Sequence, residues 1–163
     1  MRFAELGITS NFTFLTGGSH PEEYARRAAL MGIGAIAIAD ENSVAGIVRA
    51  HAALREVARE IAARAAFDRD EGPVGPPAPP GLPRPAAPSA DLANLPRLLP
   101  AARIVTREGL SAIALPRDRA AWGRLTRLIS AGRLRAAKGA CDLGLADLLE
   151  WGAGMELLLL APD

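Results

Sequence analysis

Proline sets the main constraint on how this sequence can fold. Ten of its 13 prolines lie between Pro73 and Pro100, where the backbone loses amide donors and few apolar side chains are available to bury. Proline-rich chain with interspersed glycine and alanine stays extended and solvated. We therefore expect a disordered linker or insertion over residues 68–97, between an ordered first part, residues 1–67, and an ordered second part, residues 98–163. A passive insertion is favoured over a proline-rich motif that binds a partner.

The charge balance is close to neutral, with 19 basic and 18 acidic residues and a net charge of +1. It gives no overall electrostatic reason for nucleic-acid binding of the kind that a strongly basic domain has. The single cysteine, Cys141, excludes an internal disulfide and lacks the neighbours of a zinc cluster, which fits a reducing compartment. No stretch approaches the roughly 18 apolar residues of a membrane span, and no signal peptide begins the sequence. We therefore expect a soluble cytoplasmic protein without a membrane partner.

The first part of the chain predicts strands and helices in alternation. Ser19 and Glu22 have the spacing of a capping box, and Gly32 can end the following helix in a left-handed conformation. An uninterrupted apolar segment then has the character of a buried parallel strand. The expected elements are a strand at Phe3–Ile8, a helix that ends near Leu30, a strand at Gly34–Ala39 and a helix from Ser43 to Phe67.

The second part continues the alternation and indicates an α/β fold. Its expected elements are strands at Leu110–Leu115 and Met155–Ala161 and helices at Asp118–Ser130 and Leu145–Trp151. Gly132 is expected to break the first of these helices. The right-handed crossover rule favours a parallel sheet or barrel, with functional groups at the carboxyl ends of its strands. Asp40, Glu41 and Asn42 occupy one such end.

Two blocks of sequence are specific enough to indicate a family. The first runs from Ala4 to Glu23, and the second runs from Ala114 to Leu149 and contains Pro116-Arg117-Asp118-Arg119-Ala120-Ala121-Trp122-Gly123-Arg124-Leu125. Together they resemble the amino-terminal region of error-prone bacterial DNA polymerases of the C family, and the resemblance covers residues 3–61 and about 97–161. In that family this region is the PHP domain, which is a metal-dependent phosphoesterase in its active relatives.

The resemblance implies part of the distorted (β/α)7 barrel of PHP domains, interrupted by the proline-rich insertion. The two expected parts of the chain are too short to complete that barrel. Because an incomplete barrel leaves strand edges unpaired, we expect poor solubility, self-association or dependence on a partner.

The resemblance also implies where a metal site would lie, and the residues there do not suit one. The His-x-His pair of active relatives corresponds to Gly7 and Thr9, the following Asp-His pair corresponds to Asp40 and Glu41, and a later glutamate ligand aligns with Arg103. These positions lack the imidazoles that a zinc or manganese cluster uses. We therefore expect a degenerate site with no catalytic residue and no metal.

Two other readings of the carboxylates stay open. Glu5, Asp40 and Glu41 could gather and hold a single hard cation such as magnesium through oxygens. Alternatively, Asp40 and Asn42 cap the helix that follows them. The two histidines, His20 and His51, are 31 positions apart in the sequence and are expected to have structural roles.

A run of basic residues marks the predicted helix in the second part. The residues proposed to contact nucleic acid or another domain are Arg117, Arg124, Arg127 and Arg135. A solvated helix face is the third interpretation, and it is the commonest fate of such runs. Trp122 lies among these arginines at apolar spacing and is expected to belong to the core.

By resemblance, the chain is the PHP-like scaffold region, a pseudoenzyme, of an error-prone DNA-directed DNA polymerase that acts in DNA replication, DNA repair and translesion synthesis after DNA damage. The nucleotidyltransferase chemistry, with magnesium in the palm, would lie outside this chain, so we expect no cofactor and no polymerase activity here. The implied partners are the remainder of the polymerase, DNA and translesion accessory proteins. Two alternatives remain: a PHP phosphoesterase with substitute metal ligands, and a stand-alone module that binds DNA or protein.

Overall fold

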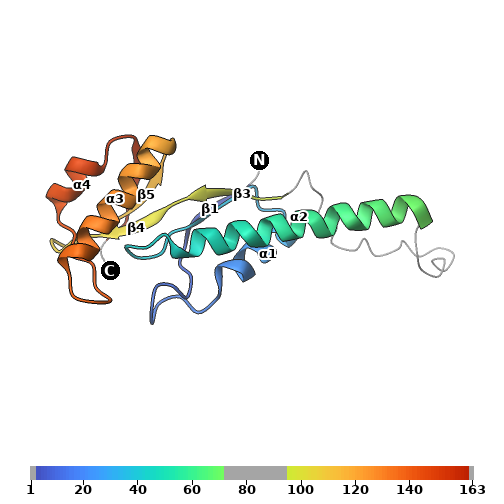
Figure 1. Ribbon diagram of the computed structural model, residues 1–163, viewed down its shortest axis with the longest axis horizontal. Coiled ribbons are helices and arrows are strands. Elements are labelled where there is room, and N and C mark those ends of the chain that lie inside the picture. The colour runs from blue at the N-terminus through green and yellow to red at the C-terminus, as the bar shows by residue number, and fades with distance from the viewer. Residues whose placement is uncertain (1–2, 72–94, 162–163) are drawn as a thin grey trace.

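The computed structural model describes residues 3–71 and 95–161, and these residues have the mixed α/β character that the sequence predicts (Figure 1). They form four helices and two three-stranded sheets. In chain order the elements are β1 (Ala4–Ile8), α1 (Pro21–Met31), β2 (Ala35–Ile38), α2 (Ala45–Glu71), β3 (Arg97–Pro100), β4 (Ala102–Val105), β5 (Ser111–Pro116), α3 (Arg119–Arg135), α4 (Leu145–Trp151) and β6 (Met155–Leu159). The predicted insertion, residues 68–97, lies mostly outside the described residues, although α2 continues to Glu71 and β3 begins at Arg97.

The two sheets are joined through the segment that contains β3 and β4. The first sheet is parallel, with β2 between β1 and β3, and the second is antiparallel, with β5 between β4 and β6. Beyond β2, Glu41 forms a parallel bridge with Arg103 of β4. The Arg103 amide donates to the Asp40 carbonyl at 3.0 Å, and the Asn42 amide donates to the Arg103 carbonyl at 2.8 Å. The segment that runs from β3 into β4 therefore stays hydrogen-bonded to β2 and to the residues after it as it passes from the first sheet into the second.

The second sheet corrects the expectation of a wholly parallel sheet. β3 and β4 were not predicted from the sequence, and β4 is joined to β5 by a tight turn in which the Thr106 amide donates to the Leu110 carbonyl at 2.9 Å. Gly109 adopts a φ of 86° in that turn. A turn this short joins antiparallel neighbours only, because a parallel connection has to cross over the sheet. The described residues do not close a barrel.

The start of α1 differs from its prediction, whereas its end agrees. The N-cap is His20, whose amide donates to the Glu23 carboxylate at 2.8 Å. The capping box predicted at Ser19 and Glu22 is therefore wrong by one residue. The left-handed end at Gly32 is confirmed by its φ of 67°.

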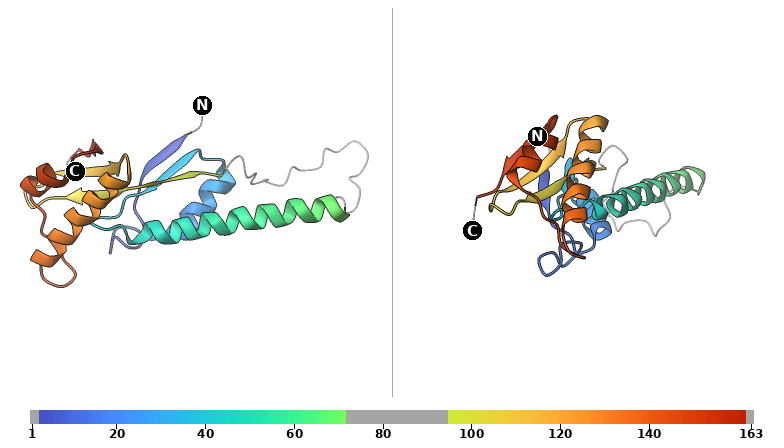
Figure 2. Two further views of the ribbon diagram at one scale, coloured as in Figure 1. Left: turned by 45° about the horizontal axis from the view of Figure 1, so that its top comes forward. Right: turned by 60° about the vertical axis from the view of Figure 1, so that its left-hand side comes forward.

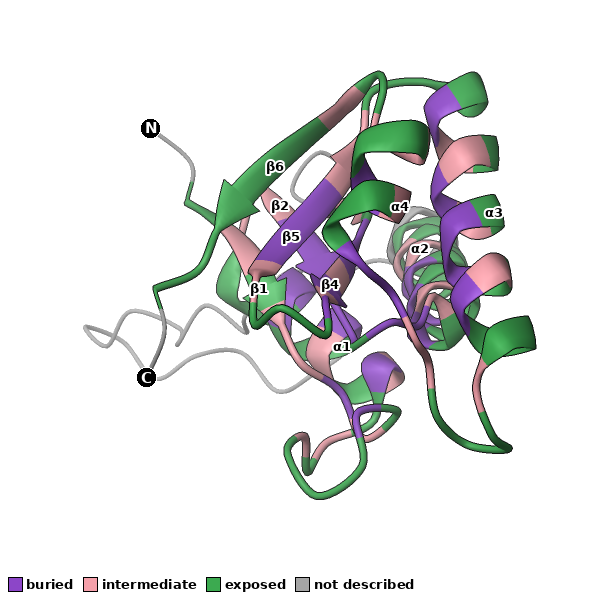
Figure 3. Cartoon of the chain, turned by 90° about the vertical axis from the view of Figure 1, so that its left-hand side faces the viewer, coloured by how far each residue is buried: buried purple, intermediate pink, exposed green. Residues whose placement is uncertain are grey.

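Helices cover one face of each sheet (Figures 1 and 2). α1 and α2 pack on the first sheet, and α3 and α4 pack on the second. The interior positions are purple in Figure 3, and a third apolar cluster joins the two sheets. α2 projects well beyond the sheets (Figure 1). None of the described helices has the length and apolar character needed to cross a bilayer.

Gly132 allows close packing and does not end the helix, which corrects its prediction. α3 continues past it to Arg135. A Cβ atom at Gly132 would lie 2.6 Å from Cδ2 of Leu143 and 2.8 Å from Sγ of Cys141. Leu143 is buried in the core of the second sheet, so it has little room to move aside. The helix can approach the segment before α4 only because this position lacks a side chain.

Replacing Gly132 with alanine is expected to destabilise the fold. Overpacking against Leu143 outweighs the gain in helix propensity, for a net loss of about 1–2 kcal/mol in the free energy of unfolding. The matched control is Gly123→Ala in the same helix, where a Cβ would meet no atom within 4 Å and which should gain up to about 1 kcal/mol. Urea unfolding followed by circular dichroism measures both, and equal stability of the two variants would contradict the packing argument.

Candidate functional site

The candidate site centres on the carboxylate of Asp40, just beyond the carboxyl end of β2. Asp40 is buried, with 1% of its surface exposed. Its Oδ1 accepts hydrogen bonds from the Ser10 amide at 2.7 Å and from Oγ1 of Thr13 at 3.0 Å, and its Oδ2 accepts from Oγ of Ser10 at 2.7 Å. The three donors come from the segment that follows β1, so this one carboxylate holds the ends of two neighbouring parallel strands together.

The first turn of α2 packs directly against this carboxylate. A Cβ atom at Gly46 would lie 2.7 Å from Oδ2 of Asp40 and 2.9 Å from Cγ2 of Ile38. Glycine is therefore required for the close approach. The positive end of the helix dipole lies beside a negative charge, which is a stabilising arrangement.

The structure corrects the interpretation of Asp40 and Asn42 as caps of α2. Asp40 is engaged by the segment after β1, as described above. Asn42 reaches across to β4, where it accepts from the Val105 amide at 3.1 Å and donates to the Val105 carbonyl at 3.2 Å. At the start of the helix it is Oγ of Ser43 that accepts from the Ala45 amide, at 3.3 Å. The side chain of Asn42 therefore serves the sheet rather than the helix.

Glu41 and Arg103, two of the positions aligned with metal ligands, form an ion pair with each other. Nη2 of Arg103 lies 2.7 Å from Oε2 of Glu41. The Glu41 amide also donates to Oγ1 of Thr13 at 2.9 Å. The one carboxylate beside Asp40 is therefore neutralised by a cation from β4.

The remaining predicted metal positions lie apart from this centre. Oε1 of Glu5 accepts from the Gly7 amide at 3.1 Å. Glu5, Gly7 and Thr9 line a groove of about 510 Å³ between β1 and α1, which Asp40 and Glu41 do not line. Within residues 3–71 and 95–161 there is no group of three or more His, Cys, Asp or Glu side chains placed to hold a metal. The residues present do not fit a catalytic metal cluster.

Several residues of this centre were missed in the sequence analysis. Ser10 and Thr13 carried no pattern that marked them. Arg133 belongs to the basic run of the predicted helix but was not assigned to this centre, where its Nη2 atom donates to the Asn42 carbonyl at 2.9 Å. Asn42 has a φ of 45°, a conformation that asparagine tolerates better than most residues. An asparagine three residues after the predicted strand was the one available signal, and it did not indicate the partner across the sheet.

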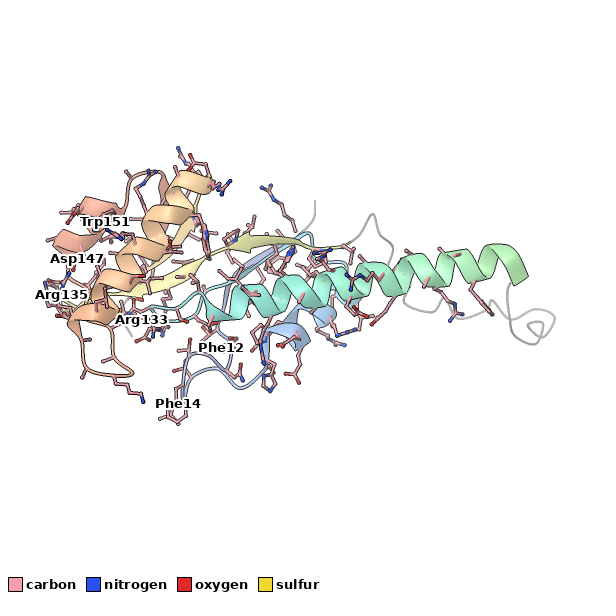
Figure 4. All side chains as sticks on the ribbon, in the orientation of Figure 1. Phe12, Phe14, Arg133, Arg135, Asp147 and Trp151 are labelled. Carbon is pink, nitrogen blue, oxygen red and sulfur yellow. The ribbon has the colours of Figure 1, made fainter. Side chains whose placement is uncertain are left out.

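The four arginines proposed to contact nucleic acid or another domain all have partners within the chain, and Figure 4 labels Arg135 and its partner Asp147. Their partners are Glu156 for Arg117, the Ala153 carbonyl for Arg124, the Trp151 ring for Arg127 and Asp147 for Arg135. These contacts tie α3 and the residue before its cap to α4, β6 and the turn between them. Contact with nucleic acid or another domain stays a prediction. Trp122 packs against the core of the second sheet, as predicted.

The strongest of these contacts joins α3 to α4. Both terminal nitrogens of Arg135 donate to the carboxylate of Asp147, at 2.8 and 2.9 Å. These bonds, followed by one from the Gly144 amide at 2.8 Å, lower the pKa of Asp147 from 3.8 to about 2. The same pairing raises the pKa of Arg135.

The lowered pKa of Asp147 makes stability depend on pH. A carboxylate whose pKa is lower in the folded state stabilises the protein above its unfolded pKa, and this contribution is lost as the pH falls from 3.8 toward about 2. We expect Asp147→Asn to flatten the pH dependence of the free energy of unfolding in that interval, measured by urea unfolding at a series of pH values. Arg135→Gln should flatten it less, because the Gly144 amide still donates to the carboxylate. An unchanged profile in Asp147→Asn would refute the assignment.

Comparison with known proteins gives the chain its family context. No family model matches it. A protein named error-prone DNA polymerase from Ruegeria pomeroyi is 52% identical over 161 residues, which are 98% of this chain and 15% of that protein. Proteins of the same name from Rhodopseudomonas palustris (strain BisB5) and Sinorhizobium medicae are each 40% identical, over 98% and 99% of this chain and 12% and 11% of their own lengths.

A solved structure from Bifidobacterium adolescentis, provisionally named a metal-dependent phosphoesterase, is similar over 82% of this chain and 35% of its own. Its TM-score of 0.47 and its identity of 17% are too low to support an argument. Across nearly its whole length, this chain is homologous to one segment of the error-prone DNA polymerases, and it spans 11–15% of the length of the relatives compared above.

Proposed function

We propose that this chain is a PHP-like scaffold segment of an error-prone DNA polymerase, and that it works without a catalytic metal. Its fold would be part of a PHP-type barrel. The proposal rests on the two carboxylates beyond β2, both of which already have partners within the chain. Asp40 already accepts three hydrogen bonds from Ser10 and Thr13, and Glu41 is paired with Arg103.

The charges around the centre support a structural role. A divalent cation at Asp40 would have to displace hydrogen bonds that fix the segment after β1. A cation at Glu41 would have to compete with the guanidinium of Arg103, which lies 2.7 Å from that carboxylate. Hydrolysis of a phosphate ester by metals needs ions that hold both the attacking oxygen and the phosphoryl group. The donor set described above supplies no imidazole for such ions.

The activity of the whole polymerase is part of the same proposal. The longer protein would extend a primer by nucleotidyl transfer during repair or translesion synthesis in the cytoplasm, with magnesium bound by carboxylates outside residues 1–163. The names of the sequence relatives support this context. The segment would brace the remainder of the polymerase, and DNA and accessory proteins would be further partners.

Metal analysis distinguishes the scaffold from a phosphoesterase with substitute ligands. Protein purified without chelators is expected to contain far less than one equivalent of zinc, manganese or iron by mass spectrometry. It should not hydrolyse p-nitrophenyl phosphate above the blank at any pH, with or without added manganese. Stoichiometric metal together with hydrolysis that a chelator abolishes would refute the scaffold proposal.

Substitution of Asp40 tests whether its role is structural. Asp40→Asn places an amide among donors that need an acceptor, and we expect it to lower the free energy of unfolding by about 1.5–3 kcal/mol. The matched control, Glu41→Gln, removes one partner of an exposed ion pair and should cost about 0–1 kcal/mol.

Added magnesium or manganese should not change the thermal unfolding temperature of the unmodified protein or that of Asp40→Asn. If Asp40 were a metal ligand, its neutralisation would stabilise the metal-free protein. It would also abolish a stabilisation by added metal that the unmodified protein shows. Either result would contradict the structural role.

A further inference from the structure

The loop between β1 and α1, residues 11–19, carries two large apolar side chains into solvent. Phe14 is 84% exposed and Leu15 is 90% exposed. Figure 4 shows Phe14 at the tip of this loop, directed away from both sheets. Turns and loop tips are normally built from glycine, proline and small polar residues. Two adjacent large apolar side chains at such a tip therefore need an explanation.

The loop is anchored at its base. Its two ends are joined by the Asn11 amide, which donates to the Ser19 carbonyl at 2.9 Å. The buried carboxylate of Asp40 accepts hydrogen bonds from Ser10 and Thr13. The tip is therefore presented by backbone that is already ordered, which lowers the entropy that a binding contact would cost.

Leu15 has a backbone conformation that is unfavourable for leucine. Its φ is 63°, in the left-handed region that glycine and asparagine tolerate and that other residues rarely adopt. The chain returns tightly at Gly17, where a Cβ atom would collide with the Ser10 carbonyl oxygen. Because the Leu15 side chain is almost fully exposed, the isolated chain gains no burial from this strained arrangement. Strain of this kind indicates a contact made outside the chain.

The charges around the loop favour a protein partner over a nucleic acid. Residues 11–19 include no charged side chain, and the first turn of α1 contributes Glu22 and Glu23. Arg49, whose guanidinium lies over the Phe12 ring at 5.7 Å, is already paired with Glu22 at 3.3 Å. Proteins that stack bases on aromatic rings combine those rings with a positively charged groove. Exposed apolar anchors without such a groove suit an apolar pocket on a protein.

We propose that Phe14 and Leu15 insert into an apolar pocket on the remainder of the polymerase. This inference rests on the proposed function, in which the chain braces a longer protein, and it names the surface that makes the contact. The chain spans 11–15% of the lengths of the relatives compared above. Most of the protein surface that such a polymerase offers to the loop therefore lies outside this chain.

Footprinting of side chains tests the contact. The isolated chain and the longer polymerase that the proposed function implies are labelled with hydroxyl radicals, and mass spectrometry measures the modification of each residue. Labelling of Phe14 and Leu15 should be severalfold lower in the polymerase, without DNA and at any protein concentration. Equal labelling in the two proteins, protection that requires added primer-template DNA, or protection of the isolated chain that grows with its concentration would each overturn the proposal.

Leu15→Asn separates docking from folding. Asparagine tolerates the left-handed conformation, so the isolated chain should unfold at a temperature up to about 4 °C higher. In the polymerase the same variant should raise the labelling of Phe14 severalfold, because the apolar contact is lost. The matched control is Leu134→Gln on α3, which changes a leucine that is 89% exposed and keeps a similar helix propensity. It should leave Phe14 protected. Full protection of Phe14 in Leu15→Asn, or equal exposure in both variants, would contradict the assignment.

Deletion of residues 1–163 from the polymerase tests the proposed function separately. The scaffold role predicts that the truncated polymerase loses stability and primer extension. If the truncated protein keeps both, the scaffold role is wrong. If it loses both while Phe14 and Leu15 are labelled equally in the isolated chain and the polymerase, the scaffold role stands and the docking contact alone is wrong.

Discussion

The buried carboxylate of Asp40 holds two strands and a helix of the first sheet in place. It accepts bonds from the backbone and side chain of the segment after β1, it directly follows β2, and the first turn of α2 lies against it. A buried charge is tolerated only when it is fully hydrogen-bonded or paired. Here the donors and the helix dipole meet that requirement, and in doing so they fix the relative positions of two strands and a helix.

The same electrostatic problem can be solved with a metal ion or with protein groups, and the choice decides the chemistry. Carboxylates that converge at the ends of parallel strands repel one another unless something positive lies between them. In this chain hydroxyl and amide donors satisfy Asp40, while Arg103 neutralises Glu41. In the proposed scaffold, these protein groups take the place that a cation would otherwise have.

Elements with strong local patterns could be predicted from the sequence, and elements defined by distant partners could not. The long run of apolar residues at helical spacing was enough to predict α2, and the left-handed conformation expected at Gly32 was enough to predict the end of α1. β3 and β4 are each four residues long and lie beside prolines, so they show no period, and their pairing alone defines them. The bonds between Asp40 and Ser10 cross 30 positions, and a carboxylate after a strand does not reveal which distant residues will donate to it.

The arginine-rich helix shows why a run of charge is weak evidence of a ligand. The guanidiniums of Arg124 and Arg127 contact groups that follow the helix in the chain, and Arg135 donates to both oxygens of Asp147. Arg133 instead donates to the Asn42 carbonyl, which precedes the helix. A phosphate that recruited Arg135 would therefore have to replace two charge-assisted bonds and leave Asp147 without its cation. Arg124 would similarly leave the Ala153 carbonyl without a donor. Binding of a polyanion through these residues would consequently be coupled to loosening of α4 from α3, so affinity for nucleic acid and stability of the second sheet would oppose each other.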